Sequence, residues 1–98
     1  MGATTFETVA SGKTAEEAFA AACERARHLN GWGGYTGTIA EKHSFVMVSR
    51  ARLPRPEAKA LAAKLIEEED SRVDDKRGPA GCIPLDDDRF LFFGWASS

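Results

Sequence analysis

The segment RFLFFGWA at residues 89–96 constrains the fold more than any other part of the sequence. Successive side chains of a strand point to opposite faces, so Phe90 and Phe92 lie on one face. The other face carries three apolar side chains, Leu91, Phe93 and Trp95. A sheet that helices cover on one side alone alternates apolar and polar residues. Both faces of this strand therefore need cover, because each aromatic left in water forfeits the burial of roughly 150–250 Å².

The cover of the second face can come from four sources. These are a second copy of the chain, another protein, a ligand, or the chain's own segments 30–34 and 74–81 folded across it. We expect a second copy, because aromatic surface of this size drives association when it is exposed. The sequence thus predicts a homodimer joined through the sheet, with a host protein as the second candidate partner. In both cases Leu91, Phe93 and Trp95 belong to the interaction surface.

A chain of 98 residues is long enough for a single domain, residues 1–98, with one core. Thr14 and Glu17 form a capping box at the start of the first helix. Pro84 places its strand at a sheet edge, because proline lacks an N–H. The hydrophobic spacing predicts strands at 4–10, 35–40, 44–49, 82–85 and 89–96, and helices at 15–29 and 57–70. This order, β-α-β-β-α-β-β, predicts an α+β, ferredoxin-like two-layer sandwich with two helices on one face of an antiparallel sheet.

Four glycines within residues 31–37 indicate either a ligand-binding loop or a turn between a helix and a strand. They do not match a dinucleotide fingerprint, since Thr36 stands where the third glycine is required. The turn is the favoured interpretation. The alternative function is that of a small-ligand or nucleotide-binding, sequestering protein, with a pocket between this segment and the GPAGC loop at 78–82. Its candidate ligand-binding residues are Trp32, Tyr35, Thr36, Thr38, Lys42 and Cys82.

Two positions offer possible catalytic chemistry. Cys82 follows a glycine-rich approach whose backbone N–H groups could stabilise an oxyanion, but no base for it is identifiable. Glu41 and His43 could form an acid–base pair, although an exposed polar turn is the favoured interpretation. The cysteine and histidine spacings fit no metal site. We therefore predict no catalytic residue, no metal and no cofactor, and we favour a protein that is not an enzyme.

The net charge of −2 hides an acidic stretch at residues 67–88, which holds nine acidic and three basic residues. An acidic surface suits a basic partner and disfavours nucleic acid. The predicted docking surface consists of Glu67, Glu68, Glu69 and Asp70. A small basic segment, residues 50–55, could contact phosphates through Arg50, Arg52 and Arg55. No apolar run approaches the roughly 18 residues that span a membrane, and no signal peptide is recognisable, so we expect a cytoplasmic location.

Three segments carry a resemblance to known sequences: GYTGTIAEK at residues 34–42, DKRGPAGCI at 75–83 and FLFFGWASS at 90–98. Together they resemble a family of small, largely uncharacterised proteins of phages and bacterial mobile elements. The resemblance implies a genomic setting in which small proteins often act by stoichiometric binding, and it implies no catalytic residue. The leading hypothesis is a non-enzymatic protein-interaction module that inhibits a host or defence factor.

Overall fold

Two helices, one short 3-10 helix and four strands make up the part of the chain that the structure describes. The structure is a computed structural model and describes residues 2–30 and 37–97. Its elements are β1 (Ala3–Ser11), α1 (Ala15–Asn30), the 3-10 helix η1 (Ile39–Glu41), β2 (Phe45–Met47), α2 (Arg55–Glu67), β3 (Ala80–Pro84) and β4 (Arg89–Ser97). The predicted α+β class is confirmed. The Thr14 cap is confirmed as well, because the backbone N–H of Glu17 donates to Thr14 Oγ1 at 3.2 Å. The Glu17 carboxylate reaches back one residue further than a capping box requires, and accepts from the backbone N–H of Lys13 at 2.9 Å.

The four strands form one mixed sheet in the order β1-β4-β3-β2. β4 runs antiparallel to both of its neighbours, and its ladder with β1 extends from Ala3 opposite Ser97 to Ser11 opposite Arg89. β2 runs parallel to β3. The expectation of an antiparallel sheet is therefore wrong at β2, whose connection to β3 contains the helix that a parallel pair requires.

Within residues 37–49, the predicted hairpin between 35–40 and 44–49 does not form. Residues 31–36 lie outside the described part of the chain. Ile39–Glu41 form η1 instead of a strand, because the side chain of Thr38 accepts a hydrogen bond from the backbone N–H of Ala40 and caps this short helix. In the segment predicted at 44–49, the strand β2 pairs with β3.

The placement of Pro84 at a sheet edge is also wrong, because β3 lies between β4 and β2. The pairing of β3 with β2 ends at Cys82, opposite Met47. Pro84 lies two residues beyond this point, where the β2 ladder needs no N–H from β3. An interior strand thus tolerates a proline at its last residue.

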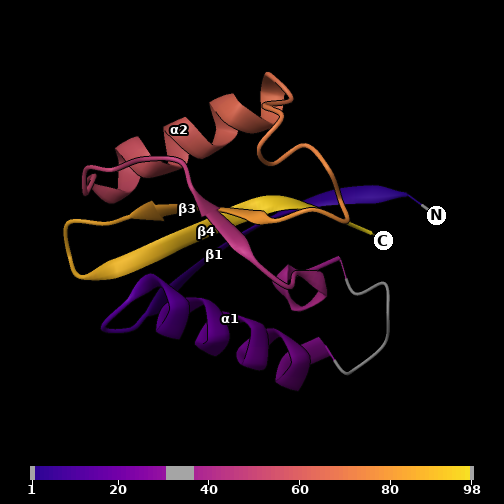
Figure 1. Ribbon diagram of the computed structural model, residues 1–98, viewed down its shortest axis with the longest axis horizontal. Coiled ribbons are helices and arrows are strands. Elements are labelled where there is room, and N and C mark those ends of the chain that lie inside the picture. Colours follow the sequence, from indigo (N-terminus) through magenta and orange to yellow (C-terminus); the bar gives the residue numbers. More distant parts are fainter. Residues whose placement is uncertain (1, 31–36, 98) are drawn as a thin grey trace.

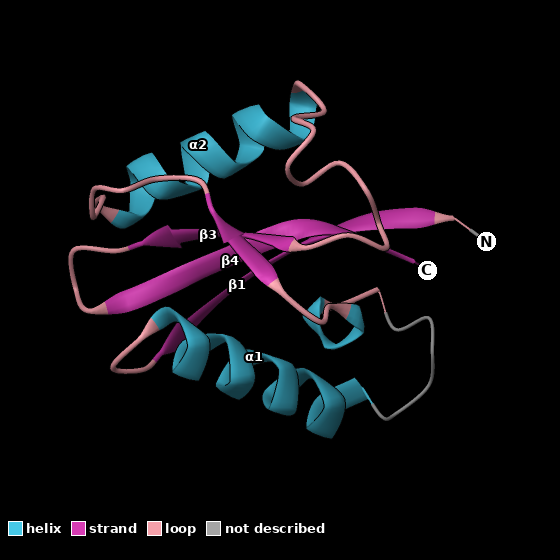
Figure 2. Cartoon of the chain, in the orientation of Figure 1, coloured by secondary structure: helices cyan, strands magenta, loops and turns pink. Residues whose placement is uncertain are grey.

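The helices lie on opposite faces of the sheet, α2 above it and α1 below it in Figure 1. The expectation that both helices lie on one face is therefore wrong. The physical reason is the strand order: β1, β2 and β3 are mutually parallel, and the chain crosses from β1 to the far edge and then steps back to β3. Right-handed crossovers in opposite directions must pass over opposite faces. Figure 2 shows the sheet between the two cyan helices.

Phe92 is at the centre of the core on the α1 side. Its ring centroid lies 5.6 Å from that of Phe19 on α1 and 5.7 Å from that of Phe45 on β2. The other buried members of this core are Ala18, Ala22, Cys23, Ile39, Cys82 and Phe90. One helix and the segment around η1 are therefore enough to cover this face.

The core on the α2 side contains Leu91 and Phe93, which are 0% and 1% exposed. Its other buried members are Ala58, Ala62, Leu65, Val73, Ile83 and Leu85. The cover of the second face is therefore α2 with Val73, within one chain, and the expectation that Leu91 and Phe93 form an interaction surface is wrong. Trp95, the third residue of that set, is only partly buried.

The end of α2 contains a strained residue. The backbone N–H of Asp70 donates to the Leu65 carbonyl at 3.0 Å, and Glu69 between them has a φ of 52°. This is the left-handed position that closes many helices and that glycine usually occupies. We expect Glu69→Gly to raise the free energy of unfolding by about 0.5–1 kcal/mol in urea titrations, because the strain of a side chain there is removed.

The matched control is Glu68→Gly, whose position has a φ of −80°. This substitution should lower stability, because glycine there only adds freedom to the unfolded chain. Equal losses of stability in the two variants would contradict the expected relief of strain at Glu69.

Candidate functional site

The predicted ligand pocket is only partly within the described residues. Trp32, Tyr35 and Thr36 lie outside them. Thr38 is half-buried, and its hydroxyl caps η1. Of the six predicted pocket residues, the structure therefore describes Thr38, Lys42 and Cys82.

Lys42 is 2% exposed, although it follows η1 in a run of polar residues. Its ammonium Nζ donates to three backbone carbonyls of the loop before β3, those of Asp75 at 3.2 Å, Lys76 at 3.1 Å and Gly78 at 3.0 Å. Burial lowers the pKa of Lys42, and the charges of Asp75 and Glu41 oppose this shift. Lys42 thus joins η1 to that loop, and the expectation that it contacts a ligand is wrong for this conformation.

Cys82 is fully buried in the centre of the sheet. Burial raises the pKa of its thiol to about 12, so almost no reactive thiolate exists near neutral pH. Cys23 is buried as well, its pKa is raised by burial, and its Sγ donates to the carbonyl of Ile39 at 3.5 Å. The expectation that Cys82 lines a ligand pocket is therefore wrong for this conformation.

The Glu41 carboxylate joins η1 to the end of β4. It accepts hydrogen bonds from the backbone N–H groups of Gly37 at 2.6 Å and Ser97 at 2.8 Å. His43 is exposed. The residues of GTIAEK at 37–42 thus have structural contacts, in which Thr38 caps, Ile39 fills the core, and the last two side chains bind backbone groups.

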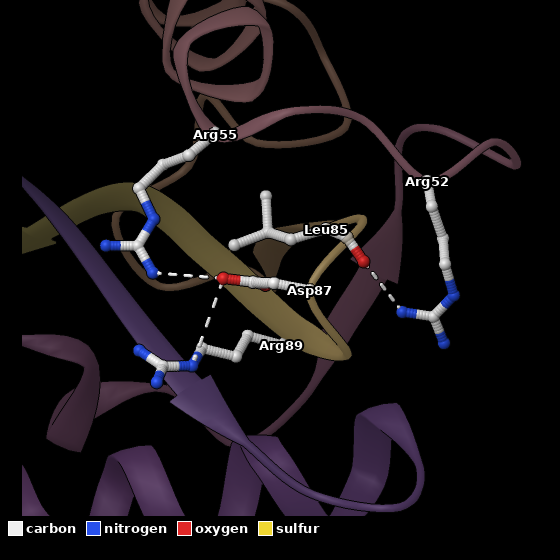
Figure 3. Close-up of polar contacts among 5 residues, drawn as sticks. All are labelled: Arg52, Arg55, Leu85, Asp87 and Arg89. Carbon is white, nitrogen blue, oxygen red and sulfur yellow. Dashed lines mark hydrogen bonds and ion pairs between the residues drawn. The ribbon is translucent and has the colours of Figure 1, made fainter.

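The basic segment at 50–55 packs against the turn between β3 and β4 (Figure 3). Arg52 Nη1 donates to the Leu85 carbonyl at 2.9 Å, and its guanidinium lies 5.4 Å from the centroid of the Phe90 ring. Arg55 Nη2 lies 3.4 Å and Arg89 Nε 4.0 Å from the same carboxylate oxygen of Asp87. These arginines therefore hold two segments of the chain together.

The predicted acidic surface lies at the end of α2 and just after it. Glu67, Glu68 and Glu69 are exposed, and Asp70 is half-buried. Arg72 contacts both Asp70 oxygens, at 2.9 and 3.1 Å, and these hydrogen bonds lower the pKa of the Asp70 carboxyl to about 2. Three of the four residues thus present acidic side chains to solvent, while Asp70 forms an ion pair with Arg72.

The outer edge of β1 is a site that the sequence reasoning missed. Strand β1 pairs with β4 on one side, and within residues 2–30 and 37–97 no strand pairs with its other side. The strand extends over nine residues, contains neither proline nor lysine, and carries one charged residue, Glu7. Natural edge strands are usually short or protected by such residues. The absence of such residues from ATTFETVAS is a sequence signal for an unprotected edge strand.

A hollow lies on each face of the sheet beside this edge. The hollow on the α1 side has a volume of about 460 Å³, and the one on the α2 side about 440 Å³. Phe6 and Glu7 line both of them. The α1 side is completed by Thr8, Val9, Ala22, Arg25, Ala26, Leu29, Thr38 and Ile39. The α2 side is completed by Thr5, Ala62, Ala63, Ile66, Glu67 and Phe93.

The two hollows differ in charge. Arg25 is exposed on the α1 side, next to Leu29, which is 70% exposed. On the α2 side Glu67 is exposed, and Glu7 lies 3.6 Å from Lys59 in an exposed ion pair. Both helices present alanine residues toward the β1 edge, and these small side chains leave space for the side chains of an added strand.

Comparison with models of known protein families, with curated proteins and with solved structures finds no match. In the described ranges, no helix combines the length and the apolar character that a bilayer crossing requires. Over the same residues, no group of three or more His, Cys, Asp and Glu side chains is arranged to hold a metal ion.

Proposed function

We propose that this protein is a non-enzymatic interaction module that binds an extended polypeptide along the outer edge of β1. The observation that supports this proposal is the nine-residue edge strand with a hollow on each face. An unpaired strand edge presents a row of N–H and C=O groups that another strand can pair with. In strand addition these groups supply affinity, and pockets for alternate side chains supply specificity.

The geometry suits an added strand. Nine residues of β1 extend over about 30 Å, enough for a ladder of several hydrogen bonds. Side chains of the added strand would alternate between the α1 side, near Ala26 and Leu29, and the α2 side, near Ala63 and Ile66. Apolar side chains on both faces of the added strand are therefore favoured.

The finer part of the proposal is that the protein inhibits a host or defence factor by stoichiometric binding. It rests on the resemblance to small phage and mobile-element proteins that the sequence leads us to expect, together with the acidic residues at the end of α2. Glu67 belongs both to those residues and to the α2-side hollow. A basic segment that continues from the added strand would meet Glu68 and Glu69 next.

The test is a selection of random peptides on sparsely immobilised protein. We expect enriched peptides with β-branched or aromatic residues at alternate positions, which bind with 1:1 stoichiometry in calorimetry. The substitution Ala63→Glu, at an exposed helix position beside the edge, should weaken binding about tenfold or more. The matched control Ala60→Glu, exposed on the same helix but away from the hollow, should not change it. No enrichment, or equal losses in both variants, would overturn the proposal.

A second candidate function is the binding of a small ligand in the α1-side hollow. One observation favours it: Thr38, a predicted ligand-binding residue, lines this hollow together with Arg25. The volume of about 460 Å³ is within the range of small-molecule sites. A thermal-shift panel of nucleotides and other anions distinguishes the two functions, because a bound ligand raises the melting temperature in proportion to the logarithm of its concentration.

A further inference from the structure

We infer that the strand which β1 binds is β1 of a second copy of this chain, related to the first by a two-fold axis. This inference rests on the proposed strand-binding function and names the strand that occupies this edge in the free protein, which a host polypeptide would have to displace. The two sheets then form one continuous sheet, with β1 and the partner's β1 antiparallel at its centre.

The two faces of β1 are fixed by the cores. Phe6 and Ala10 pack against the α1-side core, whereas Val9 packs against the α2-side core. Even-numbered residues therefore face α1, and odd-numbered residues face α2. A two-fold axis perpendicular to the sheet keeps like faces together, so each residue must lie opposite a partner residue of the same parity.

Glu7 selects among the three registers that pair at least seven residues of each β1, those centred on Phe6, Glu7 and Thr8. An axis at Glu7 would place it opposite the partner's Glu7, and like charges directly opposite each other destabilise a strand pair. An axis at Thr8 would place the carboxylate opposite the partner's Val9. An axis at Phe6 places it opposite the partner's Thr5, whose hydroxyl can donate to the carboxylate.

The register centred on Phe6 also gives favourable pairs on the α1 face. Phe6 lies opposite the partner's Phe6, and Thr4 lies opposite the partner's Thr8. Cross-strand aromatic pairs and Thr–Thr pairs both stabilise antiparallel strands. This register pairs residues 3–9 of each copy, most of the length of β1.

A second copy also closes the assembly. The two-fold contact uses the same edge of both copies, so no β1 edge remains to recruit a third. The outer edges of the joined sheet are the two β2 strands, which are only three residues long. Short edges resist further pairing, so a discrete dimer and not a fibre is expected.

The experiment combines light scattering with thiol cross-linking on the full chain. Two exposed positions are changed separately, Thr5→Cys in one preparation and Glu7→Cys in another with a distinguishable tag. Cys23 and Cys82 are buried and should react slowly. A short thiol-to-thiol linker should join the two variants in a mixture far more than it joins either variant to itself. Ala60→Cys, exposed on α2, is the control that should not cross-link.

A wild-type chain that stays monomeric at all accessible concentrations would overturn the inference. So would a dimer in which Thr5→Cys and Glu7→Cys do not join preferentially. The proposed strand binding is measured separately. If selected peptides bind the monomeric protein and do not bind the Ala63→Glu variant, strand binding is supported even when no dimer forms. If neither a dimer nor peptide binding were observed, both proposals would be overturned.

Discussion

Replacing Lys42 with methionine is expected to lower the free energy of unfolding by about 2–4 kcal/mol. Hydrogen bonds to a charged group contribute about 1.5–3 kcal/mol each, and the Lys42 ammonium makes three of them with backbone carbonyls at 3.0–3.2 Å. The loss is smaller than their sum, because methionine has no ammonium to desolvate and water can reach part of this loop. Urea titration measures the change, and hydrogen exchange should show faster opening of residues 75–79.

Lys64→Met is the matched control, since Lys64 is exposed on α2. A surface lysine of this kind should contribute less than about 0.5 kcal/mol. If the two variants lost equal amounts of stability, the three hydrogen bonds from Lys42 to backbone carbonyls would contribute nothing to the free energy of unfolding.

The second large effect is expected for Gly81→Ala. A Cβ atom at Gly81 would lie 2.5 Å from two ring atoms of Phe93 and 3.0 Å from a methyl group of Val73. All three residues are buried, so none can move into solvent. Forcing an extra methyl group into a packed core costs about 1–3 kcal/mol, and the melting temperature should fall accordingly. The glycine of the GPAGC segment is thus required by the close approach of an aromatic ring.

A double-mutant cycle with Phe93→Leu tests this explanation. The smaller side chain removes the ring that the new methyl group meets, so the cost of Gly81→Ala should shrink in the Phe93→Leu background. Strictly additive losses would show that the clash with Phe93 is not the cause.

The sequence predicted the local elements of this chain better than their arrangement. Both helices and the strands at β1 and β4 are confirmed close to their expected bounds, because apolar spacing and the Thr14 capping box are local signals. The two-sided pattern of β4 correctly indicated cover on both faces. It could not identify the cover, since the apolar stripe of α2 is equally compatible with either face of a sheet.

The candidate site was predicted less well for related reasons. Lys42 stands between two polar residues, a pattern typical of a surface turn, and its carbonyl partners come from residues 75–78. Cys82 is predicted at the start of an edge strand, beside the GPAGC loop, whereas β3 is an interior strand. Contacts between segments this far apart in the chain leave no local pattern, so only the tertiary structure identifies them.

The position of β4 has a consequence for folding during synthesis. β4 lies between β1 and β3 in the sheet, and it follows all the other described elements in chain order. β1 therefore leaves the ribosome long before the strand that pairs with it exists. Such long-range pairing slows folding, and the incomplete chain exposes apolar surface that chaperones and proteases recognise. The cooperative collapse of this protein is thus postponed until residues 89–97 have been translated.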